Sequence, residues 1–321
     1  MTYTGLVIKA HSGFFTVHTD SGERYTCTAA GRLTKGKHEE DALALGDHVT
    51  FELIKSEGFA NGRITEVEPR VRSLARKDPI ASIKNRNIRQ VIVANVDVVV
   101  FVFACTAPDF HPRMLDRYLV GAEAQKLPIL IVANKVDLVG IDAARKLFAT
   151  YEHLDYEVLY TSSNSEDVAA HAGVDALRQR LLGKLSVLTG KSGVGKSSLL
   201  NALKPGLQLE VGRISALWKK GKHTTVVPEL VALDENGQGS WIADTPGIRS
   251  YAIWDVDGEE LDAYYREIKP YVGKCTFNDC DHLDNTPGCA VRAAVAAGKI
   301  TEARYDSYCR LREELGKQPK W

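Results

Sequence analysis

Residues 190–197 read Gly190-Lys191-Ser192-Gly193-Val194-Gly195-Lys196-Ser197, which matches G-x-x-x-x-G-K-S, the phosphate-binding P-loop pattern. The residues before it, 185–189, read as a short strand, and Ser198 to Leu203 read as the start of an apolar-faced helix. In that setting the glycines let backbone N–H groups turn inward around phosphates, and the helix N-terminus adds partial positive charge. We expect Lys196 to reach the β- and γ-phosphates of a nucleotide and the Ser197 hydroxyl to ligate Mg²⁺. An ordinary glycine-rich turn is the alternative, and the flanking strand and helix disfavour it.

A second motif follows the apolar run from Pro128 to Ala133, which reads as a buried strand and ends in Asn134-Lys135-Val136-Asp137. The Asp137 carboxylate can accept two hydrogen bonds, from the N1–H and the 2-amino group of guanine. Adenine lacks these donors and would leave the carboxylate unpaired, which costs orders of magnitude in affinity. We expect Asn134 to bond the base and brace the phosphate loop, and Lys135 to cover the ring face. A plain turn is the alternative for this short pattern taken alone.

Two further stretches could contact a nucleotide. The predicted strand 157–160 ends in Thr161-Ser162-Ser163, where a second base-contacting loop would lie. Ser162 and Ser163 match the usual Ser-Ala pair only loosely, so an ordinary turn stays open. After the P-loop helix comes Gly221-Lys222-His223-Thr224-Thr225, a polar stretch suited to a switch. We expect Thr224 or Thr225 to bind Mg²⁺ when a γ-phosphate is present.

A D-x-x-G pattern completes the set. Two predicted strands, 226–233 and 240–243, lead into Asp244-Thr245-Pro246-Gly247. We expect Asp244 to lie beside the Mg²⁺, through a water molecule, and the Gly247 N–H to reach the γ-phosphate. The pattern is common by itself, and its position at a strand end is what supports this interpretation.

The order of these motifs indicates a rearranged fold. From residue 91 strands and helices alternate, as in a mostly parallel α/β sheet, with helices expected over 113–125 and about 173–182. A usual small GTPase begins with the P-loop, whereas here the base-reading motifs come first. The same sheet forms if the original chain ends are joined and new ends are opened elsewhere. We therefore predict a multidomain α/β protein with a circularly permuted P-loop G domain over 91–255.

The N-terminal part, 1–68, predicts short strands with turns between them, at 5–10, 14–18, 24–28, 47–53 and 62–67. Five such strands suit an OB-type β-barrel, a fold that often holds nucleic acid, and the loop 32–38 would offer basic side chains. A barrel that acts only as a spacer is the alternative.

A basic segment, expected to be a linker over 69–90, follows the barrel. Between 70 and 90 it carries seven cations against the single acid Asp78: Arg70, Arg72, Arg76, Lys77, Lys84, Arg86 and Arg89. Such density is typical of contact with phosphate backbones, and a merely solvated linker is the alternative.

The C-terminal part, 256–321, reads as helical and contains Cys275, Cys280, His282 and Cys289 in the spacing C-x4-C-x-H-x6-C. Three thiolates and one imidazole make a complete tetrahedral set for one structural Zn²⁺, with no open position. Reduced cysteines in a small helical core are the alternative. Three other cysteines are expected to be ordinary thiols: Cys27, Cys105 and Cys309.

The composition is that of a folded protein with two or three domains: 321 residues, 44% hydrophobic, 26% charged and a formal net charge of zero. The first residues lack the basic and apolar segments of a signal peptide. The most apolar run, 91–105, is interrupted by Asn95 and Asp97 and is too short to span a bilayer. We expect a cytoplasmic protein with no membrane association.

Taken together, the barrel, basic segment, permuted G motifs and cysteine–histidine set resemble the bacterial RsgA family, also called YjeQ or EngC. The resemblance implies a GTPase that binds GTP and GDP with Mg²⁺ and carries one Zn²⁺. We expect the protein to be a monomer. It also implies that the OB-fold and the zinc domain contact the 30S ribosomal subunit and its 16S rRNA late in assembly, and that the subunit strongly stimulates hydrolysis. Lys222 departs from the family, which often has Arg there, and Thr161-Ser162-Ser163 is a loose match.

One residue predicts slow intrinsic hydrolysis. Ile248 follows the D-x-x-G motif, where Ras-like proteins place the Gln that orients the attacking water, and isoleucine cannot orient water. We hypothesise that His223, or an element ordered by rRNA, supplies this contact; His223 could equally anchor the switch loop. Lys196, Thr225 and His223 are therefore the candidate catalytic residues. A second hypothesis is that the nucleotide state of residues 244–250 repositions the zinc domain.

Two other functions compete with an assembly GTPase. The first is an RNA-binding module whose nucleotide is structural, which multiple turnover in the presence of 30S would exclude. The second is an ATP-dependent kinase on the same loop, which Asn134-Lys135-Val136-Asp137 disfavours.

Overall fold

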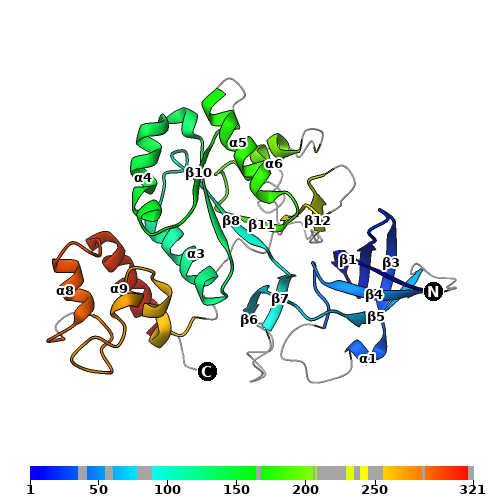
Figure 1. Ribbon diagram of the computed structural model, residues 1–321, viewed down its shortest axis with the longest axis horizontal. Helices are drawn as coiled ribbons and strands as arrows, with labels where there is room; N and C mark the ends of the chain where they lie inside the picture. The colour runs from blue at the N-terminus through cyan, green and yellow to red at the C-terminus, as the bar shows by residue number, and fades with distance from the viewer. Residues whose placement is uncertain are drawn as a thin grey trace, which may run out of the picture.

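The computed structural model describes residues 1–34, 42–54, 61–77, 89–163, 168–204, 207, 229–234, 239–244, 256–283 and 286–316. Three parts follow one another along the chain in Figure 1: the barrel (described residues within 1–67), the central region (described residues within 89–244) and the C-terminal region (described residues within 256–316). The barrel lies on one side of the central region, and the C-terminal region lies on the other side.

The barrel is made of five strands and a short helix, β1 (Thr2–His11), β2 (Phe14–His18), β3 (Arg24–Ala29), α1 (Gly31–Thr34), β4 (His48–Leu53) and β5 (Gly62–Val67). The strands follow the order β1-β2-β3-β5-β4, and β1 pairs with β4 to close the sheet. A hairpin turn joins β2 to β3, where the Thr19 N–H donates to the Glu23 carbonyl and Gly22 takes a φ of +89°. The inward side chains form one core: Val7, Val17, Cys27, Val49, Phe51 and Ile64. The OB-type barrel is confirmed.

The central region is a doubly wound sheet with strand order β10-β9-β8-β11-β13-β12. Its elements are β8 (Val98–Ala104), α3 (Pro112–Ala124), β9 (Ile129–Asn134), η1 (Val136–Leu138), α4 (Ile141–His153), β10 (Val158–Thr161), α5 (Val168–Leu181), β11 (Leu185–Thr189), α6 (Lys196–Leu203), β12 (Glu229–Ala232) and β13 (Trp241–Asp244). All neighbouring pairs are parallel except β12–β13.

Helices cover both faces of this sheet, because its central strands are apolar on both sides. In β8, Phe101 packs into the core under α3 and α4, whereas Val100 packs into the core under α5 and α6. Figure 1 shows the two helix pairs on opposite faces. With the P-loop strand at its centre and the chain entering at β8, the sheet confirms the circularly permuted order.

The barrel and the central region share one continuous sheet, which the sequence analysis did not predict. The strand β12 at the edge of the central sheet pairs antiparallel with β1, where Lys9 lies opposite Glu229. The segment expected to be a linker contains a strand near each of its ends, β6 (Ser73–Lys77) and β7 (Arg89–Ala94). These two strands pair antiparallel and form a hairpin. Arg70, just before it, pairs with the fully buried Asp47 of the barrel at 2.7 Å.

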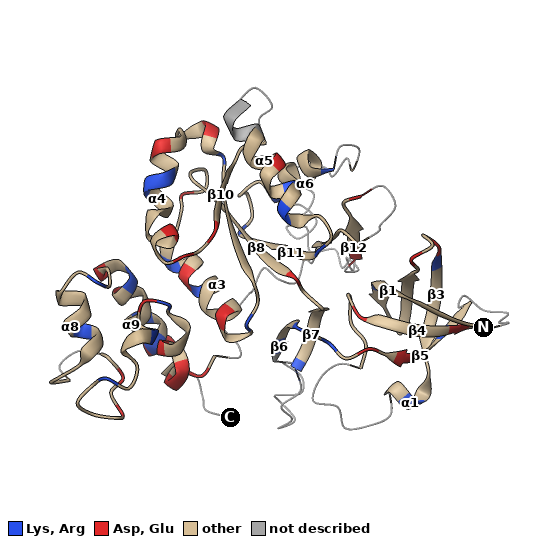
Figure 2. Ribbon diagram, viewed as in Figure 1, with Lys and Arg blue, Asp and Glu red and all other residues tan. Residues whose placement is uncertain are grey.

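The C-terminal region consists of η3 (Gly258–Tyr264), η4 (Lys269–Tyr271), α8 (Ala290–Ala296) and α9 (Glu302–Gly316). Its core includes Tyr265, Ile268 and Tyr308, and α3 of the central region contributes Val120 to it. Acidic and basic positions occur along α3 and in the C-terminal region (Figure 2), and two ion pairs join α3 to α9: Arg113 with Asp306 at 2.8 Å, and Arg117 with Glu314. Among the described helices, none has the length and apolar character needed to cross a membrane.

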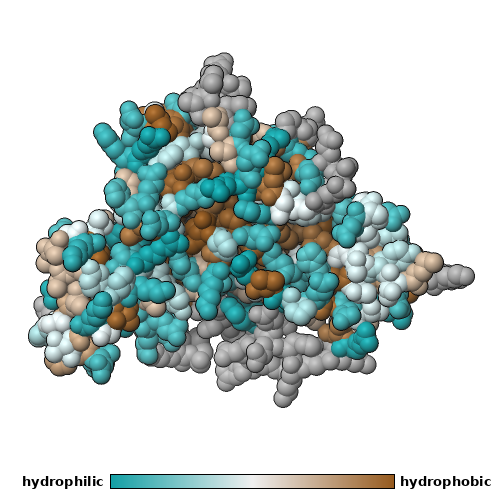
Figure 3. All heavy atoms as spheres, in the orientation of Figure 1, coloured by the Kyte–Doolittle hydropathy of each residue, from teal (hydrophilic) through white to brown (hydrophobic). Residues whose placement is uncertain are grey.

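On the face of the molecule that is turned toward the viewer in Figure 3, apolar side chains gather in the middle, over the central region. Mostly hydrophilic side chains surround them.

Candidate nucleotide site and metal centre

The predicted nucleotide-binding residues gather at one edge of the central sheet. Because β9, β10, β11 and β13 run parallel, their carboxyl ends meet there, and each ends at or next to a predicted motif. Asn134 ends β9, Thr161 ends β10, Thr189 ends β11 just before the P-loop, and Asp244 ends β13. This is where ligands bind in open α/β sheets.

The P-loop has the backbone that its glycines make possible. Gly190 has a φ of +155° and Gly195 a φ of +96°, both in the region that side chains rarely adopt. A Cβ on Gly190 would lie 2.2 Å from the Val102 carbonyl oxygen, and one on Gly195 would lie 2.4 Å from Asn134 Nδ2. Only glycine therefore fits at these two positions, and α6 begins directly after the second of them.

Lys196 is the first residue of α6, and its ammonium group lies over the loop. Nζ donates to the carbonyl oxygens of Gly190 at 2.6 Å and Lys191 at 2.9 Å. The cation thereby lies against the backbone of the loop, and its expected contact with the phosphates of a nucleotide stays a prediction.

Asn134 joins the base-reading strand to the P-loop. Its side chain is buried, with 1% exposed, and its Nδ2 donates to the Val194 carbonyl at 2.9 Å. The buried Thr161 hydroxyl donates to Asn134 Oδ1 at 3.0 Å and so fixes which way the amide points. The predicted brace between Asn134 and the phosphate loop is present. Thr161 is a further residue of this site, and its signal was a polar residue at the end of the predicted strand 157–160.

Asp137 and Ser162 come from different loops and meet at the same edge. Asp137 is exposed, and its Oδ1 accepts a hydrogen bond from the buried Ser162 hydroxyl at 2.6 Å. Ser163 is exposed beside them. Ser162 thus orients a carboxylate that remains open to solvent. The expected contact of Ser162 and Ser163 with a base stays a prediction.

The loop after β8 also belongs to this site, and no motif indicated it. Lys135, in a left-handed conformation with a φ of +63°, donates through Nζ to the Ala107 carbonyl of that loop. A small pocket lies between this loop and the P-loop, and its lining includes Pro108, His111 and Lys191. The loop leads directly into α3, so this helix begins next to the phosphate loop.

Several predicted residues lie outside the described part of the chain: Lys222, His223, Thr224, Thr225, Gly247 and Ile248. Ser192, Gly193, Ser197 and Ser198 are described with the P-loop and α6. Asp244 is described as the last residue of β13, opposite Glu229 of β12.

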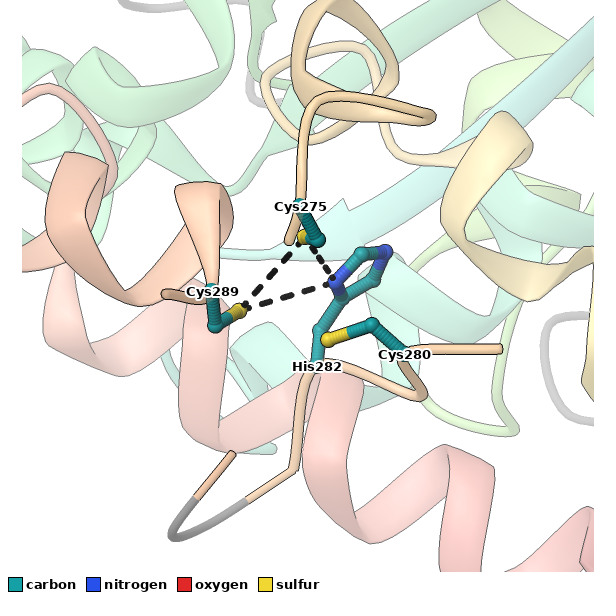
Figure 4. Close-up of side chains that lie close together, drawn as sticks. All are labelled: Cys275, Cys280, His282 and Cys289. Carbon is teal, nitrogen blue, oxygen red and sulfur yellow. Dashed lines mark hydrogen bonds between the residues drawn. The ribbon is translucent and has the colours of Figure 1, made fainter. Parts of the chain in front are cut away.

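The four predicted zinc ligands form one cluster. The ligand atoms of Cys275, Cys280, His282 and Cys289 all lie within 4.8 Å of one another. Figure 4 shows the four side chains pointing toward a common centre, with His282 Nδ1 3.4 Å from the Cys275 sulfur and 3.6 Å from the Cys289 sulfur. The set and its size fit a tetrahedral zinc ion.

The surroundings of the cluster orient its ligands. His282 Nε2 lies 3.1 Å from Asp262 Oδ2, which leaves Nδ1 for the cluster, as in many zinc sites. Burial works against a charge on His282, but hydrogen bonds with Asp262 and Cys289 raise its pKa to about 9. Burial likewise opposes the Cys289 thiolate, yet backbone N–H groups at the start of α8 lower the pKa of that thiol. A metal would therefore displace a proton from His282 and bind thiolates.

Some of the predicted basic residues have structural partners. Arg70 bonds Asp47 and Arg76 bonds Gln90, so these two hold the hairpin and the barrel in place. In α9, Arg304 is 3% exposed and bonds Asp116 of α3 and Glu267. Burial alone would lower the pKa of Arg304, but the two carboxylates raise it. Arg70 and Arg304 therefore stabilise the fold, because each is paired with buried carboxylates.

Comparison with known proteins agrees with this architecture. The family model described as RsgA GTPase matches residues 67–254, and the model of the RsgA N-terminal domain matches residues 4–59. The chain is 42% identical over 314 residues to the small ribosomal subunit biogenesis GTPase RsgA of Gemmatimonas aurantiaca, with 97% of each chain covered. It is 36% identical over 315 residues to the protein of that name from Chlorobaculum tepidum, with 98% of each covered.

Two solved structures share the fold over the whole chain. YjeQ from Thermotoga maritima superposes with a TM-score of 0.75 at 32% identity, over 99% of this chain and 100% of that one. YloQ, described as a circularly permuted GTPase, gives a TM-score of 0.71 at 29% identity, over 100% of this chain and 98% of that one. The chain therefore belongs to the RsgA GTPase family and is a GTP hydrolase with a circularly permuted G domain.

Proposed function

We propose that this GTPase binds the 30S ribosomal subunit during its late maturation, contacts 16S rRNA, and hydrolyses GTP to GDP and phosphate with stimulation by the subunit. The observation that carries the proposal is the hydrogen-bonded edge of the central sheet, where Asn134 joins the P-loop to the base-reading strands. The names of the relatives, small ribosomal subunit biogenesis GTPases, supply the partner.

Guanine selection is assigned to Asp137. Ser162 occupies Oδ1 of this carboxylate and holds it in one orientation. The exposed carboxylate can then accept from the N1–H and 2-amino groups of guanine, which adenine cannot offer. Asn134 bonds the base edge and Lys135 covers the ring face. A competition assay between GTP and ATP tests this, and an equal affinity for both would favour the kinase interpretation.

The phosphates are assigned to the P-loop. The backbone N–H groups of residues 190–197 and the ammonium of Lys196 hold them, while Ser197, Thr225 and Asp244 are the proposed magnesium ligands, Asp244 through water. Magnesium supplies neutralisation of the negative charge that develops on the phosphates. Gly247 and either Thr224 or Thr225 sense the γ-phosphate.

Hydrolysis is expected to be slow without the subunit, because Ile248 stands where a water-orienting Gln is usual. His223, or an element ordered by rRNA, is proposed to supply that contact. The variant His223→Ala tests it: the subunit-stimulated rate should fall, and an unchanged rate would make His223 a loop anchor instead.

Zinc is assigned to Cys275, Cys280, His282 and Cys289, one ion per chain, in a structural role with no open position. The ion would hold the loop between η4 and α8 against α9. In that position the C-terminal region presents its surface to the subunit together with the barrel. A difference in 30S affinity between GDP and a GTP analogue is expected if residues 244–250 reposition this region.

The decisive experiment measures GTP turnover at fixed salt with no addition, with 30S subunits and with 50S subunits. A large stimulation by 30S and little by 50S would support the proposal. Turnover that ignores 30S would contradict it and favour an RNA-binding protein whose nucleotide is structural. Fixed salt matters because phosphate-backbone contacts weaken steeply as salt rises.

A further inference from the structure

We propose that β1 of the barrel positions the two strands that carry the nucleotide-sensing segments, with Lys9 and Glu229 as the positioning residues for GTP hydrolysis. The inference rests on the proposed role of Asp244 beside the magnesium ion. It concerns turnover in the absence of any ribosomal subunit, and is therefore separate from the partner assigned above.

The first step of the argument is register. Lys9 of β1 lies opposite Glu229 of β12, and Glu229 lies opposite Asp244 of β13. The three residues thus form one row across three strands, with a barrel residue at one end and Asp244 at the other. Hydrogen-bonded strand pairs hold such a row in place, and a slip by one residue would turn every side chain of the strand to the other face.

The second step is the position of β12 and β13 in the chain. β12 begins at Glu229, directly after the segment that contains the predicted switch threonines, and β13 ends at Asp244, where the D-x-x-G motif begins. Without β1, β12 would be the outer edge of the central sheet. Edge strands are held on one side only, so the pairing with β1 supplies the missing restraint.

The third step is that the barrel is fixed to these strands by side chains as well. Lys9 Nζ lies 3.1 Å from Glu229 Oε2, and the two side chains are 40% and 42% exposed. His18 of β2 packs edge-on against Trp241, the first residue of β13, with ring centroids 5.1 Å apart. Ile8 of β1 is 1% exposed and belongs to the hydrophobic core of the central region.

Alternation along β1 explains how one strand can do this. Val7 points into the barrel core, whereas its neighbours Leu6 and Ile8 pack with Leu230 and Trp241 in the core of the central region. Successive residues of a strand face opposite sides, so a single strand joins the two cores without a linker. Because β1 belongs to the barrel and pairs with β12, a movement of the barrel would shift β12 as well.

The test uses charge reversal at the exposed pair, in the full chain. Lys9→Glu and Glu229→Lys each replace attraction by repulsion, and the double variant restores it with opposite signs. We expect each single variant to lower GTP turnover roughly two- to fivefold, as for an exposed ion pair, and the double variant to recover most of the loss. Glu66→Lys is the matched control, because it reverses an exposed charge on β5, which pairs with β3 and β4 in the described sheet. Its turnover should equal that of the wild type.

Two readouts separate positioning from general destabilisation. The Mg²⁺ concentration for half-maximal turnover should rise in the single variants and return in the double variant, while the melting temperature stays within a degree or two of the wild type. Hydrogen exchange of peptides that cover 229–232 and 241–244 should speed up, with β11 unchanged.

Wild-type turnover in Lys9→Glu, or a double variant as slow as the singles, would overturn the inference. A wild-type chain that hydrolyses no GTP, either alone or with 30S subunits, would instead overturn the proposed function.

Discussion

At the scale of single residues, Asn134 joins the two halves of the nucleotide site. Its amide donates to the P-loop at Val194 and accepts from Thr161, and it is buried among these partners. A buried amide that loses one partner keeps the desolvation cost of the unpaired atom, about 1–3 kcal/mol. The orientation of Asn134 therefore depends on the Thr161 hydroxyl.

We expect Thr161→Val to weaken GDP binding about five- to fiftyfold, since this isosteric change removes the donor to Asn134 and leaves its carbonyl oxygen unpaired. Thr161→Ser keeps the hydroxyl and should bind within about threefold of the wild type. Titration with a fluorescent GDP analogue measures both. Equal affinity of the valine and serine variants would mean that Asn134 holds its orientation without Thr161.

Gly195 offers a second test at this scale. An added Cβ would lie 2.4 Å from Asn134 Nδ2, at a backbone φ of +96°. We expect Gly195→Ala to reduce nucleotide affinity more than a hundredfold, because the P-loop and Asn134 cannot both keep their places. Gly183→Ala is the matched control: its φ is +67°, but its Cβ would meet nothing within 4 Å. The control should lose about 1 kcal/mol of stability and keep its nucleotide affinity.

At the scale of elements, α3 fastens the C-terminal region to the central region. Asp116 of α3 accepts from Arg304 of α9 and from Tyr151 of α4, and Arg304 also bonds Glu267. The guanidinium carbon lies 4.6 Å from the Tyr265 ring centroid. This network is buried, so its charges depend on one another for compensation.

We expect Arg304→Met to lower the free energy of unfolding by about 3–5 kcal/mol, because it leaves Asp116 and Glu267 buried without their cation. Arg310→Met, on the exposed side of the same helix, should change it by less than about 1 kcal/mol. Urea unfolding followed by circular dichroism compares the two. If the triple variant with Asp116→Asn and Glu267→Gln were no more stable than Arg304→Met alone, the loss would come from packing rather than uncompensated charge.

The zinc cluster also belongs to this scale, because its four ligands bring together separate segments of the C-terminal region. Cys289→Ser should abolish stoichiometric zinc and lower the melting temperature, because structural zinc contributes directly to folding. Cys309→Ser removes a half-buried thiol outside the cluster and should retain one zinc per chain. Metal analysis of the purified proteins measures this. Full zinc content in Cys289→Ser would contradict the assigned ligand set.

How well the sequence predicts these elements depends on whether the signal is local. The P-loop strand 185–189 coincides with β11, and the cysteine–histidine spacing identifies the whole metal cluster, since both are carried by adjacent residues. The hairpin β6–β7 was missed because β6 lies among cations and β7 coincides with the start of the apolar run 91–105. Arg304 occupies the buried face of α9 with Tyr308 and Leu311, at helical spacing, but an arginine on a buried face has no local signature.

At the scale of the whole molecule, the join between the barrel and the central region is invisible to any local pattern. The edges of β1 and β12 are complementary only once both sheets exist, and they lie 220 residues apart, as the Lys9–Glu229 separation shows. The sequence could therefore predict the barrel and the G domain separately. It could not predict that one strand belongs to both cores.

That shared strand predicts that the barrel and the central region unfold as one unit, and two buried cysteines can report on them separately. Cys27 lies in the barrel core and Cys105 in the core of the central region. Burial raises the pKa of the Cys27 thiol to about 12 and that of Cys105 to about 11, so neither reacts until its surroundings open.

GDP at 100 times its dissociation constant stabilises the folded state by about 2.7 kcal/mol. It should therefore slow thiol labelling of both cysteines by a similar factor, on the order of a hundredfold, measured by mass spectrometry. In Ile8→Ala, which removes a buried contact of β1 with the central core, Cys27 should label faster and GDP should protect it less than Cys105. If GDP protected Cys105 alone in the wild type, the barrel would open independently, and β1 would be an interface rather than a strand common to both cores.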